Sequence, residues 1–162
     1  MFIFLEKIAA FLVSILVMIF GIPSDFDPVE PPNNIETEKI EIISNDWDLN
    51  TTGKYVFDNF ADLGVYCFTI NRSNRMKEYA DSLGEDFFDE NNLVIVDVAL
   101  ADTAEKAFVA SAVENGNTLN LQYYKKDVAD MGACVICYDS ICIKVSKNIT
   151  KVNAVELIAP TF

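Results

Sequence analysis

The sequence predicts an α+β protein with a mostly antiparallel sheet of about five to seven strands, one amphipathic helix packed on it, and a hydrophobic helix at the N-terminus. The central strand is predicted at residues 93–99, a near-continuous β-branched run typical of a strand buried on both faces. Residues 76–83 place apolar side chains at helical spacing. Asn115-Gly116 separates two alternating segments, which indicates a β-hairpin.

The N-terminal segment predicts either a membrane anchor or a signal peptide. Residues 8–22 are almost entirely apolar, and residues 2–5 extend the run to the roughly 20 residues that span a bilayer if Glu6 and Lys7 snorkel. A charged start followed by an apolar centre is also the pattern of a cleaved signal peptide, although a small-x-small cleavage site is poor here. Both alternatives stay open, and both export the remainder of the chain.

The chain therefore divides into three predicted parts: an anchor or signal peptide at residues 1–23, a linker at 24–38, and an extracytoplasmic domain at 39–158. The linker is rich in proline and acidic residues and too poor in apolar residues to order itself. Because Lys7 precedes the apolar run, an uncleaved anchor gives a single-pass cell-membrane protein with its C-terminal domain outside. Cleavage gives a secreted protein instead.

The composition argues against two functional classes. The chain has 25 Asp and Glu against 12 Lys and Arg, a net charge of -13. A nucleic-acid footprint needs clustered Lys and Arg, so we predict no nucleic-acid partner. The chain has no histidine, which removes Ser-His and Cys-His catalysis and the commonest metal ligand.

Two strands are predicted before the helix. Residues 39–42 alternate and predict a first strand at the edge of the sheet. Residues 65–70 predict another strand, in which Tyr66, Phe68 and Ile70 share a face.

Local signals bound the predicted helix. Ser73 is its N-cap, and Gly84 supplies the left-handed C-terminal position. The acidic segment 85–92 follows, without the spacing of an EF-hand calcium loop. We therefore interpret Phe87 and Phe88 as anchors in the core, with the neighbouring carboxylates in water.

After the central strand, a two-residue loop at Asn115-Gly116 predicts the register of the hairpin. The predicted pairs, all on the apolar face, are Phe108 with Tyr123, Ala110 with Leu121, and Ala112 with Leu119. Residues 133–147 predict a long strand, and residues 152–158 predict a last strand or a helical turn.

The four cysteines favour structural roles. Cys134 and Cys137 match a CxxC motif, but the β-branched residues inside it predict a strand, whose alternation points the two side chains to opposite faces. A four-cysteine zinc site is disfavoured because three of the four lie on one apparent strand without a knuckle glycine. Buried thiols and one disulfide, such as Cys67 to Cys142, are the alternatives that remain.

Four stretches carry a resemblance: Asp86-Phe87-Phe88, residues 93–96, Asn115-Gly116 and residues 141–145. Over about residues 66–146 the chain resembles a group of small exported bacterial domains of unknown function, including the C-terminal domain of a protease-complex accessory subunit. Members of that group often carry a glycine-rich segment after the central strand, where this chain has residues 99–104. The resemblance implies an antiparallel α+β fold and a non-catalytic, protein-binding role, and it transfers no catalytic residue.

These observations predict a membrane-tethered extracytoplasmic interaction or accessory domain that is not an enzyme and has no catalytic, cofactor-binding or metal-binding residues. Its predicted partners are an envelope or extracellular protein and, through the N-terminal helix, the membrane. One alternative is a secreted protein that binds a small ligand in an apolar pocket. Another is a carboxylate-based hydrolase, for which Asp97 or Asp102 at the end of the central strand is the first candidate.

Overall fold

The computed structural model of the protein describes residues 33–46, 52–69, 73–129, 132–133 and 135–159. The chain divides into two units, Met1–Glu30 and Pro31–Phe162, and the described residues all belong to the second. The predicted anchor and the first part of the predicted linker lie outside the described residues. No helix within the described part of the chain is long and apolar enough to cross a membrane.

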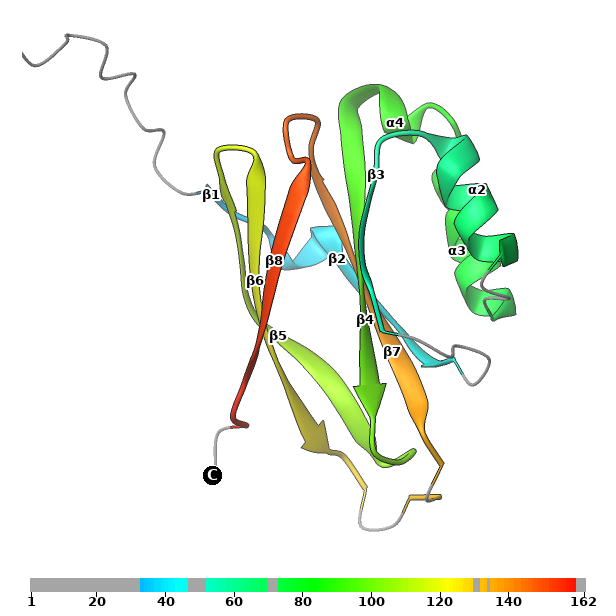
Figure 1. Ribbon diagram of the computed structural model, residues 1–162, viewed down its shortest axis with the longest axis vertical. Helices are drawn as coiled ribbons and strands as arrows, with labels where there is room; N and C mark the ends of the chain where they lie inside the picture. Colours follow the sequence, from blue (N-terminus) through cyan, green and yellow to red (C-terminus); the bar gives the residue numbers. More distant parts are fainter. Residues whose placement is uncertain (1–32, 47–51, 70–72, 130–131, 134, 160–162) are drawn as a thin grey trace, which may run out of the picture. The chain divides into compact units, whose positions relative to one another are not determined.

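The described residues form two four-stranded sheets that pack face to face (Figure 1). The outer sheet contains, in spatial order, β1 (Asn33–Asn34), β5 (Glu105–Asn115), β6 (Thr118–Asp127) and β8 (Lys151–Leu157). The helix-covered sheet contains β2 (Ile40–Asp46), β7 (Cys137–Ser146), β4 (Asn91–Leu100) and β3 (Lys54–Phe57). The α+β class is therefore confirmed, but the expectation of one sheet is wrong.

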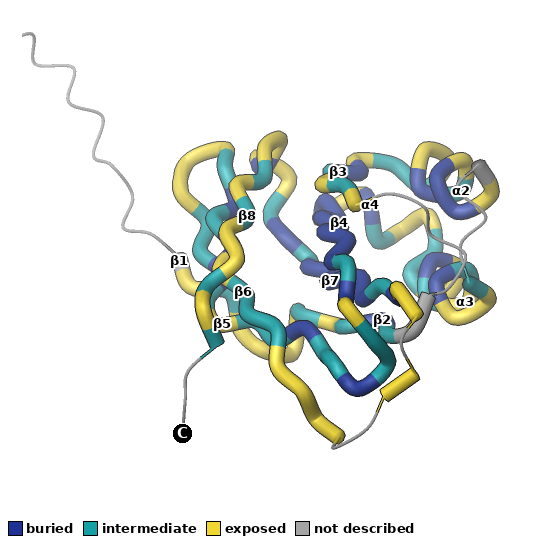
Figure 2. The backbone as a smooth tube through the Cα atoms, turned by 60° about the horizontal axis from the view of Figure 1, so that its bottom comes forward, coloured by how far each residue is buried: buried dark blue, intermediate teal, exposed yellow. Residues whose placement is uncertain are grey.

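The second sheet has a physical reason. A strand buried on both faces needs cover on both faces of its sheet. The apolar face of the hairpin formed by β5 and β6 supplies that cover on one side of β4. As a result, most residues of β4 and β7 are buried, as Figure 2 shows.

Helices cover the other face of β4. The described residues contain α2 (Phe60–Thr69), α3 (Asn74–Leu83), a single turn α4 (Phe87–Glu90) and the 3-10 turn η1 (Thr37–Lys39), rather than one helix alone. Figure 1 shows α2 and α3 side by side next to β3 and β4.

Two hydrophobic cores result from this arrangement. The core between the sheets includes Val94, Val96, Leu119, Leu121 and Ile141. The core under the helices includes Leu63, Met76, Ala80, Leu93 and Ile95. Successive side chains of residues 93–96 in β4 thus enter opposite cores, which is why this run is apolar without alternation.

The helix α3 is confirmed with its predicted ends. The Ser73 hydroxyl oxygen accepts a hydrogen bond from the backbone N–H of Met76 at 3.4 Å, as an N-cap does. Gly84 follows the last turn with φ of +69°, a conformation that favours glycine. Phe88 is buried in the core beneath the helices and Phe87 packs against that core, as predicted.

The predicted strand at residues 65–70 is wrong, because α2 covers the described part of it. Three buried side chains share one face of α2 at the spacing i, i+3, i+4: Leu63, Tyr66 and Cys67. The opposite face carries Val65 and Phe68, which are 62% and 80% exposed. Apolar residues on both faces of the helix obscured its period in the sequence.

The predicted hairpin is confirmed, but its loop is Gly116-Asn117 rather than Asn115-Gly116. Asn115 pairs with Thr118 at the end of the ladder, and Gly116 adopts φ of +58°. The predicted turn therefore lies one residue too early in the chain.

A bulge changes the pairing again farther from the loop. The register of β5 shifts between Val109 and Ser111, so Phe108 lies opposite Tyr124 rather than Tyr123, and their rings stack at 5.4 Å. Nearer the loop, Ala112 pairs with Leu121 instead of Leu119. Three of the predicted inward residues are nevertheless buried: Ala112, Leu119 and Leu121.

The remaining strands largely follow the prediction. β2 is an edge strand and β4 is central in its sheet. β7 forms most of the long strand predicted at residues 133–147, but it begins only at Cys137, so the described residues before Cys137 are not in the strand, contrary to the prediction. β8 is a strand rather than a helical turn, and it pairs parallel with β6.

Candidate functional site

The two acidic residues named for catalysis bind different groups. Asp97 is 4% exposed and accepts hydrogen bonds from the hydroxyls of Tyr66 at 3.0 Å and Ser140 at 2.7 Å. Asp102 accepts from the backbone N–H groups of Ala104 and Glu105 in its own loop. Asp97 therefore belongs to a buried hydrogen-bonded cluster, whereas Asp102 stabilises a turn. Their carboxylates bond to different partners and do not form the facing pair that a carboxylate-based hydrolase needs.

Three of the cysteines are buried thiols that form no disulfide: Cys67, Cys137 and Cys142. The alternative of a disulfide between Cys67 and Cys142 is therefore wrong, and Cys134 of the CxxC motif lies outside the described residues. Burial, together with the acidic groups Asp139, Asp102 and Glu105, raises the pKa of the Cys137 thiol above its usual value, although Lys106 opposes this. Among the described residues, no group of three or more His, Cys, Asp and Glu side chains is placed to hold a metal ion.

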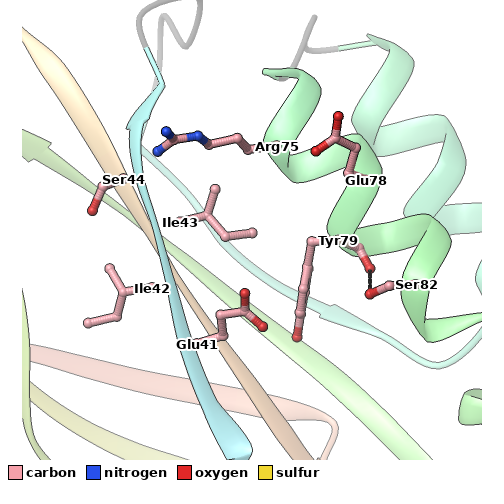
Figure 3. Close-up of a pocket in the computed structure, with 8 residues that line it drawn as sticks. All are labelled: Glu41, Ile42, Ile43, Ser44, Arg75, Glu78, Tyr79 and Ser82. Carbon is pink, nitrogen blue, oxygen red and sulfur yellow. Dashed lines mark hydrogen bonds between the residues drawn. The ribbon is translucent and has the colours of Figure 1, made fainter.

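A groove lies between β2 and α3 at the edge of the helix-covered sheet (Figure 3). Its volume is about 590 Å³, and it is open to solvent along its length. Four residues of β2 and four of α3 line it: Glu41, Ile42, Ile43, Ser44, Arg75, Glu78, Tyr79 and Ser82. A second hollow of about 410 Å³ continues it past Glu41, because Glu41, Tyr79 and Ser82 line both.

β2 forms one wall of this groove and is the last strand of its sheet. Its described residues pair with β7 alone, so the backbone groups on its other edge have no strand beside them in the described part of the chain. Ile43 points toward α3, whereas Ile42 points away from it (Figure 3). This alternation gives β2 one face toward the groove and one toward the outer sheet.

A hollow of about 270 Å³ lies on that second face, between β2 and β5. Its lining is mostly apolar: Ile35, Ile40, Ile42, Phe108, Val109 and Ala112 contribute, with Thr37, Ala110 and Ser111. Ile42 lines this hollow as well as the groove beside α3. The open edge of β2 is therefore hollowed on both of its faces.

The groove beside α3 carries charges of both signs. Arg75 lies at the Ser44 end, with its side chain extended toward β2, whereas Glu41 lies beside Tyr79 at the other end (Figure 3). Burial, then the nearby Cys142 and Glu41, raises the pKa of the Tyr79 hydroxyl, which therefore stays neutral at physiological pH. The groove therefore has Arg75 at one end and Glu41 beside the neutral Tyr79 ring at the other, with Glu78 as a second acidic residue on α3.

A further hollow, of about 290 Å³, lies on the opposite side of the sandwich near β3 and β8. Lys54, Lys125 and Glu156 line this hollow. The Lys54 ammonium group donates to the Ala154 carbonyl at 2.9 Å, and the Lys125 ammonium group lies 3.0 Å from the Glu156 carboxylate. These contacts occupy the charged side chains of Lys54, Lys125 and Glu156.

The sequence predicted the edge strand but not the groove beside it. Tyr79 belongs to the apolar stripe predicted at residues 76–83, and in the structure it both packs against the core beneath the helices and lines the groove. A signal was present in the helix, since Arg75, Tyr79 and Ser82 recur at i, i+4 and i+7 and so form a second stripe on α3. Nothing in the sequence indicated that this stripe faces β2.

Comparison with protein-family models, with curated proteins and with solved structures finds no match to this chain.

Proposed function

We propose that this protein is a non-catalytic interaction module that takes an extended segment of a partner protein as an additional strand on the free edge of β2. One observation carries the proposal: the edge is open and has a hollow on each of its two faces. In strand addition, main-chain hydrogen bonds supply affinity and pockets for alternate side chains supply specificity.

The two hollows suit the alternation of a bound strand. Side chains on one face of the segment enter the apolar hollow beside β5, and those on the other face enter the charged groove beside α3. Full burial of one Val or Ile side chain contributes about 1.5–3 kcal/mol before the cost of ordering the segment is subtracted. Two or three such side chains account for a transient but specific interaction.

The proposal includes a membrane tether. Residues 1–23 hold the domain on the outer side of the membrane, the acidic linker spaces it from the surface, and the partner is an envelope or extracellular protein. An intact mass of the natively produced protein, taken from membranes and from the medium, tests this part. The full-length mass in membranes supports the tether, and a mass lacking about the first 24 residues in the medium replaces it with secretion.

The strand-addition test uses peptides selected from a random display library on the full-length chain in detergent micelles. Hydrogen exchange then reports whether a selected peptide protects the backbone amides of β2. The edge strand β8 is the matched control, because it belongs to the outer sheet and should keep its exchange rates. We expect protection of β2 and of β7 behind it, with no change in β8.

Backbone methylation of the same peptide gives the decisive comparison. N-methyl groups at alternate positions remove the N–H groups on one edge of the peptide strand and leave the other edge intact. We expect one methylated set to abolish binding and the complementary set to retain it. Binding that survives both sets, or protection confined to β8, contradicts strand addition on β2.

A further inference from the structure

The direction of a strand added to β2 follows from the sheet it joins. The three strand pairs of the helix-covered sheet are all antiparallel: β2 with β7, β7 with β4, and β4 with β3. Antiparallel pairing is also slightly more stable for each residue than parallel pairing. An added segment therefore runs opposite to β2 and meets the Ser44 end of the edge first.

Charges of opposite sign lie at the two ends of the groove along this direction. The N-terminal turn of α3 carries Arg75 to the Ser44 end of β2, and the later turns place Tyr79 and Ser82 near Glu41 (Figure 3). Glu78 also lines the groove, but its carboxylate stays over α3 while Arg75 reaches toward β2. Arg75 and Glu41 form no ion pair within the described residues, so both charges face the groove in water.

Alternation decides which residues of the segment meet these charges. Residues opposite Ile43 and Glu41 project toward α3, because paired residues of neighbouring strands point to the same face. Residues opposite Ile42 and Ile40 project into the apolar hollow beside β5. The register of β2 shifts beyond Ile43, so the alternation is followed from Ile43 to Ile40. The two groove-facing positions are separated by one residue in the segment.

From this register, and resting on the function proposed above, we infer that the bound segment contains the pattern acidic-apolar-basic-apolar, read from its N-terminal side, opposite Ile43, Ile42, Glu41 and Ile40. The acidic residue lies opposite Ile43 and pairs with Arg75. The basic residue lies opposite Glu41, where its aliphatic stem packs on the Tyr79 ring and its charge meets the Glu41 carboxylate. The charge order in the groove thus selects both the sequence and the direction of the partner strand.

The test compares two fluorescent peptides on the full-length chain, Ser-Val-Glu-Val-Lys-Val-Ser and Ser-Val-Lys-Val-Glu-Val-Ser. They have the same composition and differ in charge order alone. We expect the wild-type protein to bind the Glu-first peptide about fivefold more tightly by fluorescence anisotropy, with the ratio falling as salt is added. The double variant Glu41→Lys with Arg75→Glu should invert this preference.

The protein variants have matched controls. Each single variant, Glu41→Lys or Arg75→Glu, should reduce the preference toward equal binding, and Glu78→Gln should leave its order unchanged. The altered side chains line an open groove rather than the core, so circular dichroism and thermal unfolding should match the wild type.

The outcomes separate this inference from the proposed function. If both peptides protect β2 from hydrogen exchange with equal affinity, or if the double variant keeps the wild-type preference, the charge-order inference is wrong and strand addition stands. If the Lys-first peptide binds wild type more tightly, the segment runs parallel to β2 and the inference is overturned. If neither peptide nor any selected peptide protects β2, the proposed function itself fails. Sedimentation that shows a dimer with protected β2 amides assigns the edge to a second copy of the chain and overturns both.

Discussion

The two long sides of the sandwich are closed in different ways. Near β3 and β8, lysines from both sheets reach across: Lys54 to the Ala154 carbonyl, and Lys125 to the Ala99 carbonyl at 3.5 Å. Within the outer sheet, Lys125 also pairs with the Glu156 carboxylate. Near β2 and β5, the space between the sheets is lined mainly by apolar side chains, and the described residues of β2 pair with β7 alone.

This difference indicates which edge is available. A bridged side gains hydrogen bonds from its own side chains and offers few unpaired polar groups to another chain. The side with β2 keeps an open strand edge and an apolar hollow between β2 and β5, and natural proteins usually protect such an edge unless it has a use. The side with β2 is therefore the one on which we place strand addition.

On the side with β2, contacts between β5 and β7 join the two sheets at the ends of these strands. The backbone N–H of Ala107 donates to the buried Asp139 carboxylate at 2.9 Å, and Lys106 lies 3.9 Å from the same group. At the other end, Glu114 accepts from the backbone and the hydroxyl of Ser146. These contacts close the ends of the sandwich while leaving its middle hollow.

The largest expected effect comes from removing the first of these contacts. Asp139→Ala leaves the buried Ala107 N–H without an acceptor, and we expect the free energy of unfolding to fall by about 3 kcal/mol in urea titrations. Hydrogen exchange should accelerate in β5 more than in β8. The exposed Asp127→Ala is the control and should change stability by less than about 0.5 kcal/mol. An equal loss in both variants refutes the assigned contact.

A smaller effect is expected on the bridged side. Lys54→Met and Lys125→Met keep the aliphatic stems but remove the bonds across the sheets, and each should lower the free energy of unfolding by about 1 kcal/mol. Exchange should accelerate in β8 and β3, and binding of peptides to β2 should be unchanged. Faster exchange in β2 instead shows that the two sides are not independent.

The smallest effect is a loss of stability at alkaline pH to which both sides contribute. Burial raises the pKa of Tyr79 beside β2, and burial followed by Glu156 raises that of Tyr123 on the bridged side. Because each folded-state pKa lies above its unfolded value, the stabilisation is complete below about pH 10 and is lost as the pH rises through the folded pKa. Cys137 adds an earlier loss above about pH 8.5.

Urea titrations between pH 8 and pH 11 measure this loss. Tyr79→Phe and Tyr123→Phe should each flatten the decline above pH 10, and Cys137→Ala should flatten the part between about pH 8.5 and pH 10. A decline that all three variants leave unchanged assigns the alkaline loss to other groups.

The elements that the sequence predicts well are those with one strong local pattern. Residues 93–99 have a β-branched run that only a doubly covered strand accommodates, and α3 has its cap at Ser73 and its stop at Gly84. The predictions failed where the pattern was uniform or interrupted. In α2 apolar residues lie on both faces, and in β5 a bulge displaces the alternation that the register prediction assumed.

The candidate site was predictable only in its parts. The sequence indicated an edge strand at residues 39–42 and an amphipathic helix through Tyr79, and both are present. Their juxtaposition depends on α2, which packs beside α3 in the structure. The sequence predicted a strand at residues 65–70, where the structure has part of α2. A groove formed by two segments more than 30 residues apart has no signature in either segment.

The sequence by itself determined the α+β class, the central strand, the capped helix and the hairpin, because hydrophobic period, caps and turn residues act over a few neighbouring positions. The tertiary structure alone decided that the chain builds two sheets, that one side of the sandwich is bridged by lysines, and that the free edge of β2 lies between two hollows. Those features arise from packing between segments that are distant in the sequence. Because the core is close-packed, the position of each segment depends on the side-chain volumes of all the others.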